Sequence, residues 1–232
     1  MRRAMTGVML LLVGGLSVGG WAMAAGGRQP VTTEAAQSRI EYHPPKRGKP
    51  GVRIGGGSRG EGGQTVALAA IVPDHVALSA TATPALCWHQ SEPTTHTRVL
   101  VLDDGQGVKP VLEQDVDQPN RVGIQCVGLE RFGVTLKAEI EYDWFIVAMI
   151  DPTQRSKDVV SGGAVMFKAP APELAEKIKG SPGHDLPPLW AAGGYWYDAV
   201  ASVITGLTEQ AADPKYLAMK DALLRQGDLP AY

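Results

Sequence analysis

The sequence predicts an α+β protein in which an antiparallel, immunoglobulin-like β-sandwich precedes a small C-terminal helical unit. Three observations predict this fold class. Short apolar runs separated by turn residues fill residues 65–169, which is typical of sandwich strands. After Pro170 the apolar residues recur with a helical period instead. The chain has 232 residues, 44% of them hydrophobic and 20% charged, so it suits one or two globular domains with a real core.

The first 24 residues have the composition of a secretory signal peptide. Arg2 and Arg3 form a charged start, and residues 6–20 are apolar. The small-x-small pattern Ala-Met-Ala follows at 22–24, which favours cleavage after Ala24. The apolar stretch is shorter than the roughly 20 residues of a membrane span. We therefore expect a periplasmic or secreted protein with no membrane span after cleavage. The alternative is an uncleaved anchor.

Residues 25–64 are predicted to be a flexible leader followed by a basic arm. Residues 25–39 carry no apolar period, and the proline- and glycine-rich segment YHPPKRGKPGVRIGGGSRG follows at 42–60. The arm is basic, whereas 13 Lys and Arg residues stand against 21 Asp and Glu residues from Gly62 onward. The cations of the arm are Lys46, Arg47, Lys49, Arg53 and Arg59.

This basic arm has two interpretations. It is either solvated or lies along the acidic body of the same chain. Alternatively, it docks on an unidentified envelope protein, an anionic polymer or a membrane surface, and its five cations are then candidate contact residues. Nucleic acid is not expected as a partner, because the compartment is wrong and no aromatic side chains interleave with the core of the arm.

Eight short strands are expected between residues 65 and 169. They cover residues 66–72, 76–81, 85–90, 97–102, 108–116, 121–127, 138–150 and 159–167. The strand at 138–150 has the strongest pattern, because alternate residues from Ile140 to Ile150 are apolar and share one face. Its other face becomes apolar near the end, which predicts a central strand that is covered on both sides there.

Region 170–232 predicts four helices. Pro172 opens the first, with acidic residues early, lysines late and Gly180 just past the end. Pro187 and Pro188 open the second, which stops before the third begins at Trp196. The third helix has an apolar stripe made of Trp196, Ala199, Val200, Val203, Ile204 and Leu207.

The last helix begins with Asp213 as its N-cap and Pro214 at its first position. Its expected buried stripe is Tyr216, Met219 and Leu223, and Gly227 ends it.

The middle helices are similar to one half of a tetratricopeptide unit. Residues 194–199, GYWYDA, match the Gly-x-aromatic-x-x-Ala turn of that repeat. There is one such unit, so the sequence does not predict a superhelical array. Trp196 is a core residue by its place in the stripe. Tyr195 falls one position off the stripe, which makes it a candidate surface contact.

Cys87 and Cys126 are the only cysteines in the chain. In an exported protein an even count favours a disulfide, and both residues lie on predicted strands. Two buried thiols are the alternative. A zinc site that recruits His89 and His96 is not favoured, because the sequence has no C-x-x-C pair.

Two glycine patterns formally match enzyme motifs. Gly55, Gly57 and Gly60 fit the dinucleotide fingerprint, and Gly56-x-Ser58-x-Gly60 fits the nucleophile elbow. Both motifs require a strand-to-helix turn, whereas a strand is predicted after this run. We therefore predict no cofactor, no catalytic Ser58 and no metal site. Glu139, Glu141 and Asp143 share a predicted strand face and provide the only carboxylate candidates for a hydrolase.

Four segments together resemble an uncharacterised bacterial exported family, domain of unknown function number 928. They are PPKRGKPGVRIGGGSRG at 44–60, LAAIVPDHVALSATATPALCWHQ at 68–90, YDWFIVAMIDPTQRSKDVVSGG at 142–163 and AAGGYWYDAV at 191–200. The resemblance extends from about Tyr42 to Leu229. Cys87 stands where the family pattern has an apolar or aromatic residue. The resemblance implies an architecture, and it carries over no activity or catalytic residue.

The sequence therefore favours a non-enzymatic interaction or scaffolding module of the cell envelope. One alternative is a cell-wall or polysaccharide-associated hydrolase that uses Glu139 and Glu141. Another is a domain that binds glycans through exposed aromatic side chains.

Overall fold

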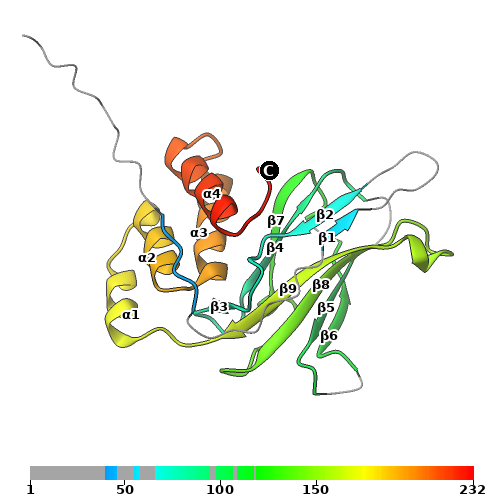
Figure 1. Ribbon diagram of the computed structural model, residues 1–232, viewed down its shortest axis with the longest axis horizontal. Coiled ribbons are helices and arrows are strands. Elements are labelled where there is room, and N and C mark those ends of the chain that lie inside the picture. The colour runs from blue at the N-terminus through cyan, green and yellow to red at the C-terminus, as the bar shows by residue number, and fades with distance from the viewer. Residues whose placement is uncertain (1–39, 46–54, 58–65, 95–97, 107–108, 118) are drawn as a thin grey trace, which may run out of the picture. The chain divides into compact units, whose positions relative to one another are not determined.

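The computed structural model describes residues 40–45, 55–57, 66–94, 98–106, 109–117 and 119–232. Within these residues nine strands form two sheets, and four α-helices follow them in the chain (Figure 1). The protein is therefore α+β, as predicted, with two largely antiparallel sheets and a C-terminal helical region. None of the helices in these ranges is long and apolar enough to cross a membrane.

The first sheet has the order β1-β2-β4-β7, and all its pairs are antiparallel. Its strands are β1 (Gly55–Gly57), β2 (Ala67–Ala70), β4 (Ala85–Gln90) and β7 (Gly123–Gly128). Along β4, Leu86 and Trp88 are fully buried on the inner face. Cys87 and His89 alternate onto the opposite face, which the helices cover.

The second sheet has the order β3-β9-β8-β5-β6. Its strands are β3 (Ala77–Ser79), β5 (Arg98–Asp103), β6 (Leu112–Asp115), β8 (Glu141–Ala148) and β9 (Val159–Phe167). β8 is central, as predicted, and its buried side chains are Tyr142, Trp144, Ile146 and Ala148. The expectation of a purely antiparallel fold is wrong at one edge, where β3 runs parallel to β9.

The predicted strand at 138–150 is wrong at its start. Glu139 has a φ of 60°, in the left-handed region, and β8 begins only at Glu141. This turn breaks the alternation, so Ile140 is 37% exposed instead of buried. It also removes Glu139 from the strand face that it was predicted to share with Glu141 and Asp143.

The helices begin and end close to the predicted residues. They are α1 (Pro172–Lys179), α2 (Leu186–Ala192), α3 (Trp196–Glu209) and α4 (Pro214–Gln226), with the short 3₁₀ turns η1 (Leu129–Phe132), η2 (Arg155–Lys157) and η3 (Gly183–Asp185). Gly194, with a φ of 84°, turns the chain between α2 and α3. At Gly206 a side chain would collide with the Tyr216 ring, so this glycine lets α3 and α4 approach closely.

The first turn of α3 joins the helical region to both sheets. Trp196 is fully buried, and its Nε1 donates to the carbonyl oxygen of Ile71 at 2.8 Å. Tyr197 donates its hydroxyl to the carbonyl oxygen of Ala164 at 2.9 Å and accepts from Trp144 Nε1 at 2.8 Å. These bonds satisfy polar atoms inside the core, where an unpaired group costs free energy.

A carboxylate also links α3 to the second sheet. Asp198 accepts from the backbone N–H of Ala80, just after β3, at 2.8 Å. Burial raises the pKa of Asp198 to about 6, although hydrogen bonds from Ala80 and Ser79 favour the charged form. Helices and sheets therefore share one hydrophobic core, and residue 170 marks a change of secondary structure within it.

Residues 40–45, which lie within the predicted leader and basic arm at 25–64, pack against the helices (Figure 1). Ile40 and Tyr42 are buried, and the Tyr42 ring meets Trp196 edge-on at 4.9 Å. The Gln226 side chain accepts from Tyr42 N at 2.7 Å and donates to the Ile40 carbonyl oxygen at 3.0 Å. The alternation of Ile40 and Tyr42 was too short to stand out from the surrounding polar sequence.

Candidate functional site

A cleft of about 410 Å³ lies between the first sheet and the helices α3 and α4. The residues just before and at the start of β7 form one side, and the end of α3 forms another. α4 and the C-terminal segment contribute one residue each. The lining residues are Arg121, Gly123, Ile124, Ile204, Leu207, Thr208, Ala211, Lys220 and Tyr232.

The apolar walls of the cleft come from the sheet and from α3. Ile124 lies opposite His89 in the β4–β7 pair, on the face that the helices cover. Ile204 and Leu207 end the apolar stripe of α3 and are only half-buried, unlike Val200 and Val203 earlier in the stripe. Below these walls there is a space of only about 10 Å³, so the floor of the cleft is closed.

Arg121 is an exposed cation at the mouth of the cleft. Two buried polar side chains fix the backbone around it. Arg98 donates to the carbonyl oxygens of Asp117, at 2.9 Å, and Pro119, in the loop that leads to Arg121. Gln125 donates its amide to the Arg121 carbonyl oxygen. The position of Arg121 is therefore set by the sandwich, while its guanidinium group reaches solvent.

Lys220 of α4 is the second cation of the cleft, and its side chain is 18% exposed. Its ammonium group donates to the carbonyl oxygen of Tyr232 and lies 3.4 Å from the carboxylate of exposed Asp221. No Asp or Glu is among the residues that line the cleft. The cleft therefore has two cationic side chains beside aliphatic walls, of which Arg121 is exposed and Lys220 is already paired.

A stacked aromatic pair adjoins Lys220. The rings of His89 and Tyr232 are 4.0 Å apart between centroids and 14° from parallel. Partial burial lowers the pKa of His89, and the charge of Lys220 lowers it further. The lowered pKa favours the neutral imidazole, so the stacked pair adds no charge beside Lys220.

This arrangement is suited to binding. The hydroxyl of Thr208 already donates to the Ile204 carbonyl oxygen at 2.8 Å, so it is held in the helix hydrogen-bond pattern. The lining contains no Asp or Glu side chain that could act as a general base towards it. What the cleft supplies is an exposed cation at Arg121, a second, paired cation at Lys220 and an apolar wall, which match a ligand with anionic and aliphatic groups.

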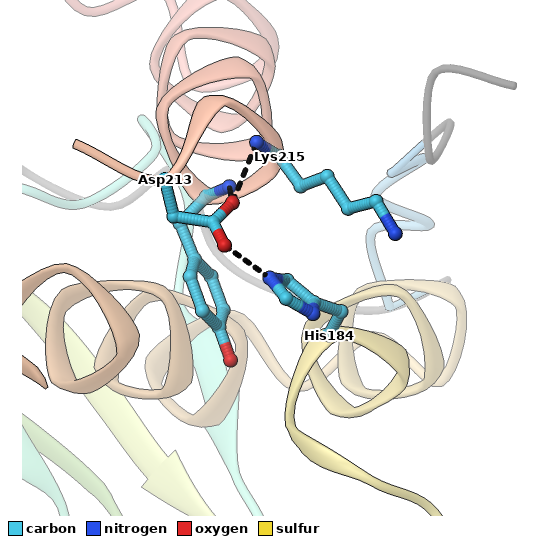
Figure 2. A network of polar contacts seen from close by, with 4 residues as sticks. His184, Asp213 and Lys215 are labelled. Carbon is cyan, nitrogen blue, oxygen red and sulfur yellow. Dashed lines mark hydrogen bonds and ion pairs between the residues drawn. The ribbon is translucent and has the colours of Figure 1, made fainter. Parts of the chain in front are cut away.

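A second polar cluster joins η3 to α4 (Figure 2). His184 Nε2 lies 2.9 Å from Asp213 Oδ2, and Asp213 Oδ1 accepts from the backbone N–H of Lys215 at 2.8 Å and of Tyr216 at 3.3 Å. The His184 ring also stacks on Tyr216 at 4.4 Å. Figure 2 shows that the ammonium group of Lys215 points away from the carboxylate.

The polar groups of this second cluster are hydrogen-bonded to one another. Burial raises the pKa of Asp213, but hydrogen bonds from Lys215, His184 and Tyr216 outweigh that effect and hold the pKa below its usual value. Among the described residues no serine, threonine or cysteine hydrogen-bonds to His184. The pair fastens η3 to the N-terminus of α4, which the predicted N-cap Asp213 begins.

Comparison with known proteins places the chain in a family. Residues 54–232 match the Domain of Unknown Function (DUF928) family. The chain belongs to this family. The match runs from the basic arm through β1 to the end of the chain, so it includes the cleft and the His184–Asp213 pair. The family carries no assigned function.

Two further comparisons add no function. No curated protein matches the chain. Among solved structures, the chain is similar to an engineered protein whose crystal structure was determined at 1.98 Å by the Northeast Structural Genomics Consortium, with 10% identity and a TM-score of 0.31. The similarity covers 44% of this chain and 20% of that chain, so this chain spans about a fifth of the other. A likeness this weak supports no argument.

The predicted contact residues have two outcomes. The arm cations Lys46, Arg47, Lys49, Arg53 and Arg59 lie outside the described residues. The prediction for Tyr195 is wrong, because it is 5% exposed, and its hydroxyl donates to the Ala169 carbonyl oxygen at 3.2 Å. Tyr195 precedes α3 and meets Trp190 edge-on, so the helical period of α3 does not decide its exposure.

The predicted disulfide between Cys87 and Cys126 is present. The two residues are directly opposed in the β4–β7 pair, with their Cα atoms 4.0 Å apart. The bond occupies the sulfur that a zinc site would need, and His89 stacks on Tyr232. His96 lies outside the described residues, within which no three His, Cys, Asp or Glu side chains form a metal-binding group.

The glycine run does not have the context that either enzyme motif requires. Gly55–Gly57 form β1, which pairs antiparallel with β2, so Gly55 and Gly57 lie within a strand. Ser58 and Gly60 lie outside the described residues. A dinucleotide site needs these glycines at the turn into a helix.

The cleft residues were missed by sequence reasoning. Arg121 is one cation just before a predicted strand, and Lys220 is one lysine on an amphipathic helix. Neither has a local pattern that distinguishes it from a solvated charge. The one usable signal was that Ile204 and Leu207 extend the stripe of α3 beyond the residues needed to cover the sheet.

Proposed function

We propose that this protein is a non-enzymatic binding module of the cell envelope, and that it binds its partner in the cleft between β7 and α3. The observation that carries this proposal is the lining of the cleft, in which Arg121 and Lys220 flank aliphatic residues and no Asp or Glu side chain is present. Such a surface attracts an anionic, partly apolar ligand and lacks the acid–base pair that hydrolysis needs.

The rigidity of the cleft supports a binding role. Its floor is the β4–β7 pair, which the Cys87–Cys126 disulfide crosslinks on the same face as His89 and Ile124. Its other wall is α3, whose first turn is bonded to both sheets. A preformed site loses less conformational entropy when it binds a ligand.

The envelope location rests on the signal-like N-terminal sequence and on the disulfide, because disulfides persist in oxidising compartments. On the same footing we propose that the two sheets are an immunoglobulin-like sandwich and that the helices are a single tetratricopeptide-like unit, two architectures that commonly present binding surfaces. The hydrolase alternative required Glu139 and Glu141 on one strand face. It loses that basis, since Glu139 lies outside β8 in a left-handed conformation.

A site-specific cross-linking experiment tests the proposal. A photoreactive benzoylphenylalanine is introduced at Leu207, in the cleft, or at Val111, which is 46% exposed and lies before β6 in the second sheet. We expect an adduct in living cells at Leu207 that disappears when Lys220→Glu is added. Equal adducts at both positions, or none at Leu207, would contradict a binding role for the cleft.

A further inference from the structure

The shape of the cleft restricts what it can hold. Ligand pockets that enclose a small molecule usually bury most of its surface. Here the space below Ile204 and Ile124 is only about 10 Å³, so little room extends beneath the cleft of about 410 Å³. We therefore place the ligand in the cleft itself, along the surface between β7 and α3.

We propose that the ligand is an extended, acidic segment of a partner polypeptide that pairs with the outer edge of β7 and lies against α3. This inference rests on the proposed function and names the class of partner. It commits to a peptide, in which carboxylate side chains alternate with aliphatic ones.

The position of β7 supports strand pairing. β7 is the last strand in the order β1-β2-β4-β7, so within the described part of the chain no strand pairs with its outer side. An edge strand presents backbone N–H and C=O groups that an extended peptide can join. Gly123 and Ile124, at the start of β7, line the cleft directly.

Charge complementarity supports an acidic peptide. Arg121 and Lys220 are the charged residues of the lining. The contact between Lys220 and the Tyr232 carbonyl oxygen shows that this ammonium group can reach a main-chain oxygen at the edge of the cleft. A carboxylate of the partner would make a charge-assisted hydrogen bond with the exposed Arg121.

The apolar wall supports alternation within the peptide. Side chains of an extended segment point alternately to opposite sides. The set that faces the helices would meet Ile204 and Leu207 of α3 beside Lys220, while the other set would bring its carboxylates to the exposed Arg121. Val122, which is 60% exposed beside Arg121, extends the apolar surface beyond the cleft. An anionic polysaccharide offers the charge without aliphatic groups to cover these residues.

The test uses the full chain and a defined probe, a fluorescein-labelled peptide of alternating Glu and Val, about eight residues long, the length of a typical strand. Fluorescence anisotropy should show saturable binding. Affinity should fall about tenfold or more for Arg121→Glu and for Lys220→Glu, since each places a like charge at the carboxylates. The matched control Lys109→Glu reverses an exposed cation between β5 and β6 and should bind normally.

Two N-methylated peptides test strand pairing. Methyl groups on alternate backbone nitrogens remove the donors of one edge of the peptide, and the complementary set removes those of the other edge. We expect one set to abolish binding and the other to be tolerated. Equal binding by both sets would overturn the pairing with β7 and the proposal with it.

The remaining outcomes separate this inference from the proposed function. If polygalacturonate or dodecanoate binds in a manner sensitive to Arg121→Glu and the peptide does not, the peptide is wrong and the cleft remains a binding site. If no probe binds and Leu207 gives no cross-link, both fail. Melting curves confirm folding of each variant, and Arg121→Glu suffices if Lys220→Glu unfolds the protein, because Arg121 is exposed.

Discussion

The two ends of helix α3 have different surroundings. At its first turn, Trp196, Tyr197 and Asp198 each hydrogen-bond to a different segment of the sheets. At its other end, Ile204 and Leu207 are half-buried beside a cleft with two cations. The first turn of α3, which is buried and hydrogen-bonded, stabilises the fold. The other end, which we call the open end, is half-buried and available to a ligand. Stability and the proposed binding should therefore be separable along one helix.

Trp196→Ala should have the largest effect on stability. It removes a fully buried ring and leaves the Ile71 carbonyl oxygen without its donor. Truncation of a buried aromatic costs about 3–5 kcal/mol, which denaturant unfolding measures. Leu207→Ala, at the open end of α3, is the control and should cost far less. A larger loss for Leu207→Ala would reverse the assignment of the two ends.

Removal of the disulfide should come next. The bond between Cys87 and Cys126 closes a loop with a sequence separation of 39. Chain entropy gives about 4 kcal/mol for a loop of this length. The double variant Cys87→Ala/Cys126→Ala should therefore unfold at lower denaturant concentration than the wild type. Reduced wild-type protein should match the variant, and an unchanged midpoint in both would show that the bond does not brace the floor of the cleft.

Asp198→Asn should change the pH dependence of stability. Burial raises the pKa of Asp198 to about 6 from 3.8. A carboxyl whose pKa rises on folding stabilises the folded state most below about pH 4, and this contribution is lost as the pH rises through about 6. The loss amounts to up to about 3 kcal/mol for this group. Asparagine does not titrate, so the free energy of unfolding of the variant should rise relative to that of the wild type between pH 4 and pH 6. Parallel curves of unfolding free energy against pH would refute the burial of the carboxylate.

Asp213→Ala should have a smaller effect. It removes the N-cap of α4 and the partner of His184, without opening the core. Loss of an N-cap typically costs about 1 kcal/mol. The exposed Asp221, on the same helix, is the matched control and should change the midpoint little when replaced by alanine. Binding of the Glu-Val peptide should stay intact, since the closed pair lies outside the cleft lining.

Sequence patterns predicted the local features of this structure well. The ends of α1 and α4 follow from proline, glycine and the Asp213 cap, which act over a few residues. The disulfide followed from an even cysteine count in a chain that was expected to be exported. The failures at Glu139 and Tyr195 have a common cause, because each residue lies just outside the element whose period was extended to it.

The cleft could not be predicted in the same way. Arg121 and Lys220 are about 100 positions apart in the sequence, and only the packing of α4 near the first sheet brings them to one site. The parallel pairing of β3 with β9 is likewise a long-range contact. Residues 40–45 depend on Gln226 at the far end of the chain. Such contacts have no local signature.

Amide chemical-shift mapping with the Glu-Val peptide tests the central claim most directly. The two-dimensional spectrum of ¹⁵N-labelled protein is recorded as the peptide is added. We predict shifts at the open end of α3 and around it, at Gly123, Ile124, Leu207, Thr208 and Lys220, and none at Trp196, Tyr197 and Asp198. Shifts confined to the first turn of α3, or an unchanged spectrum, would contradict the account.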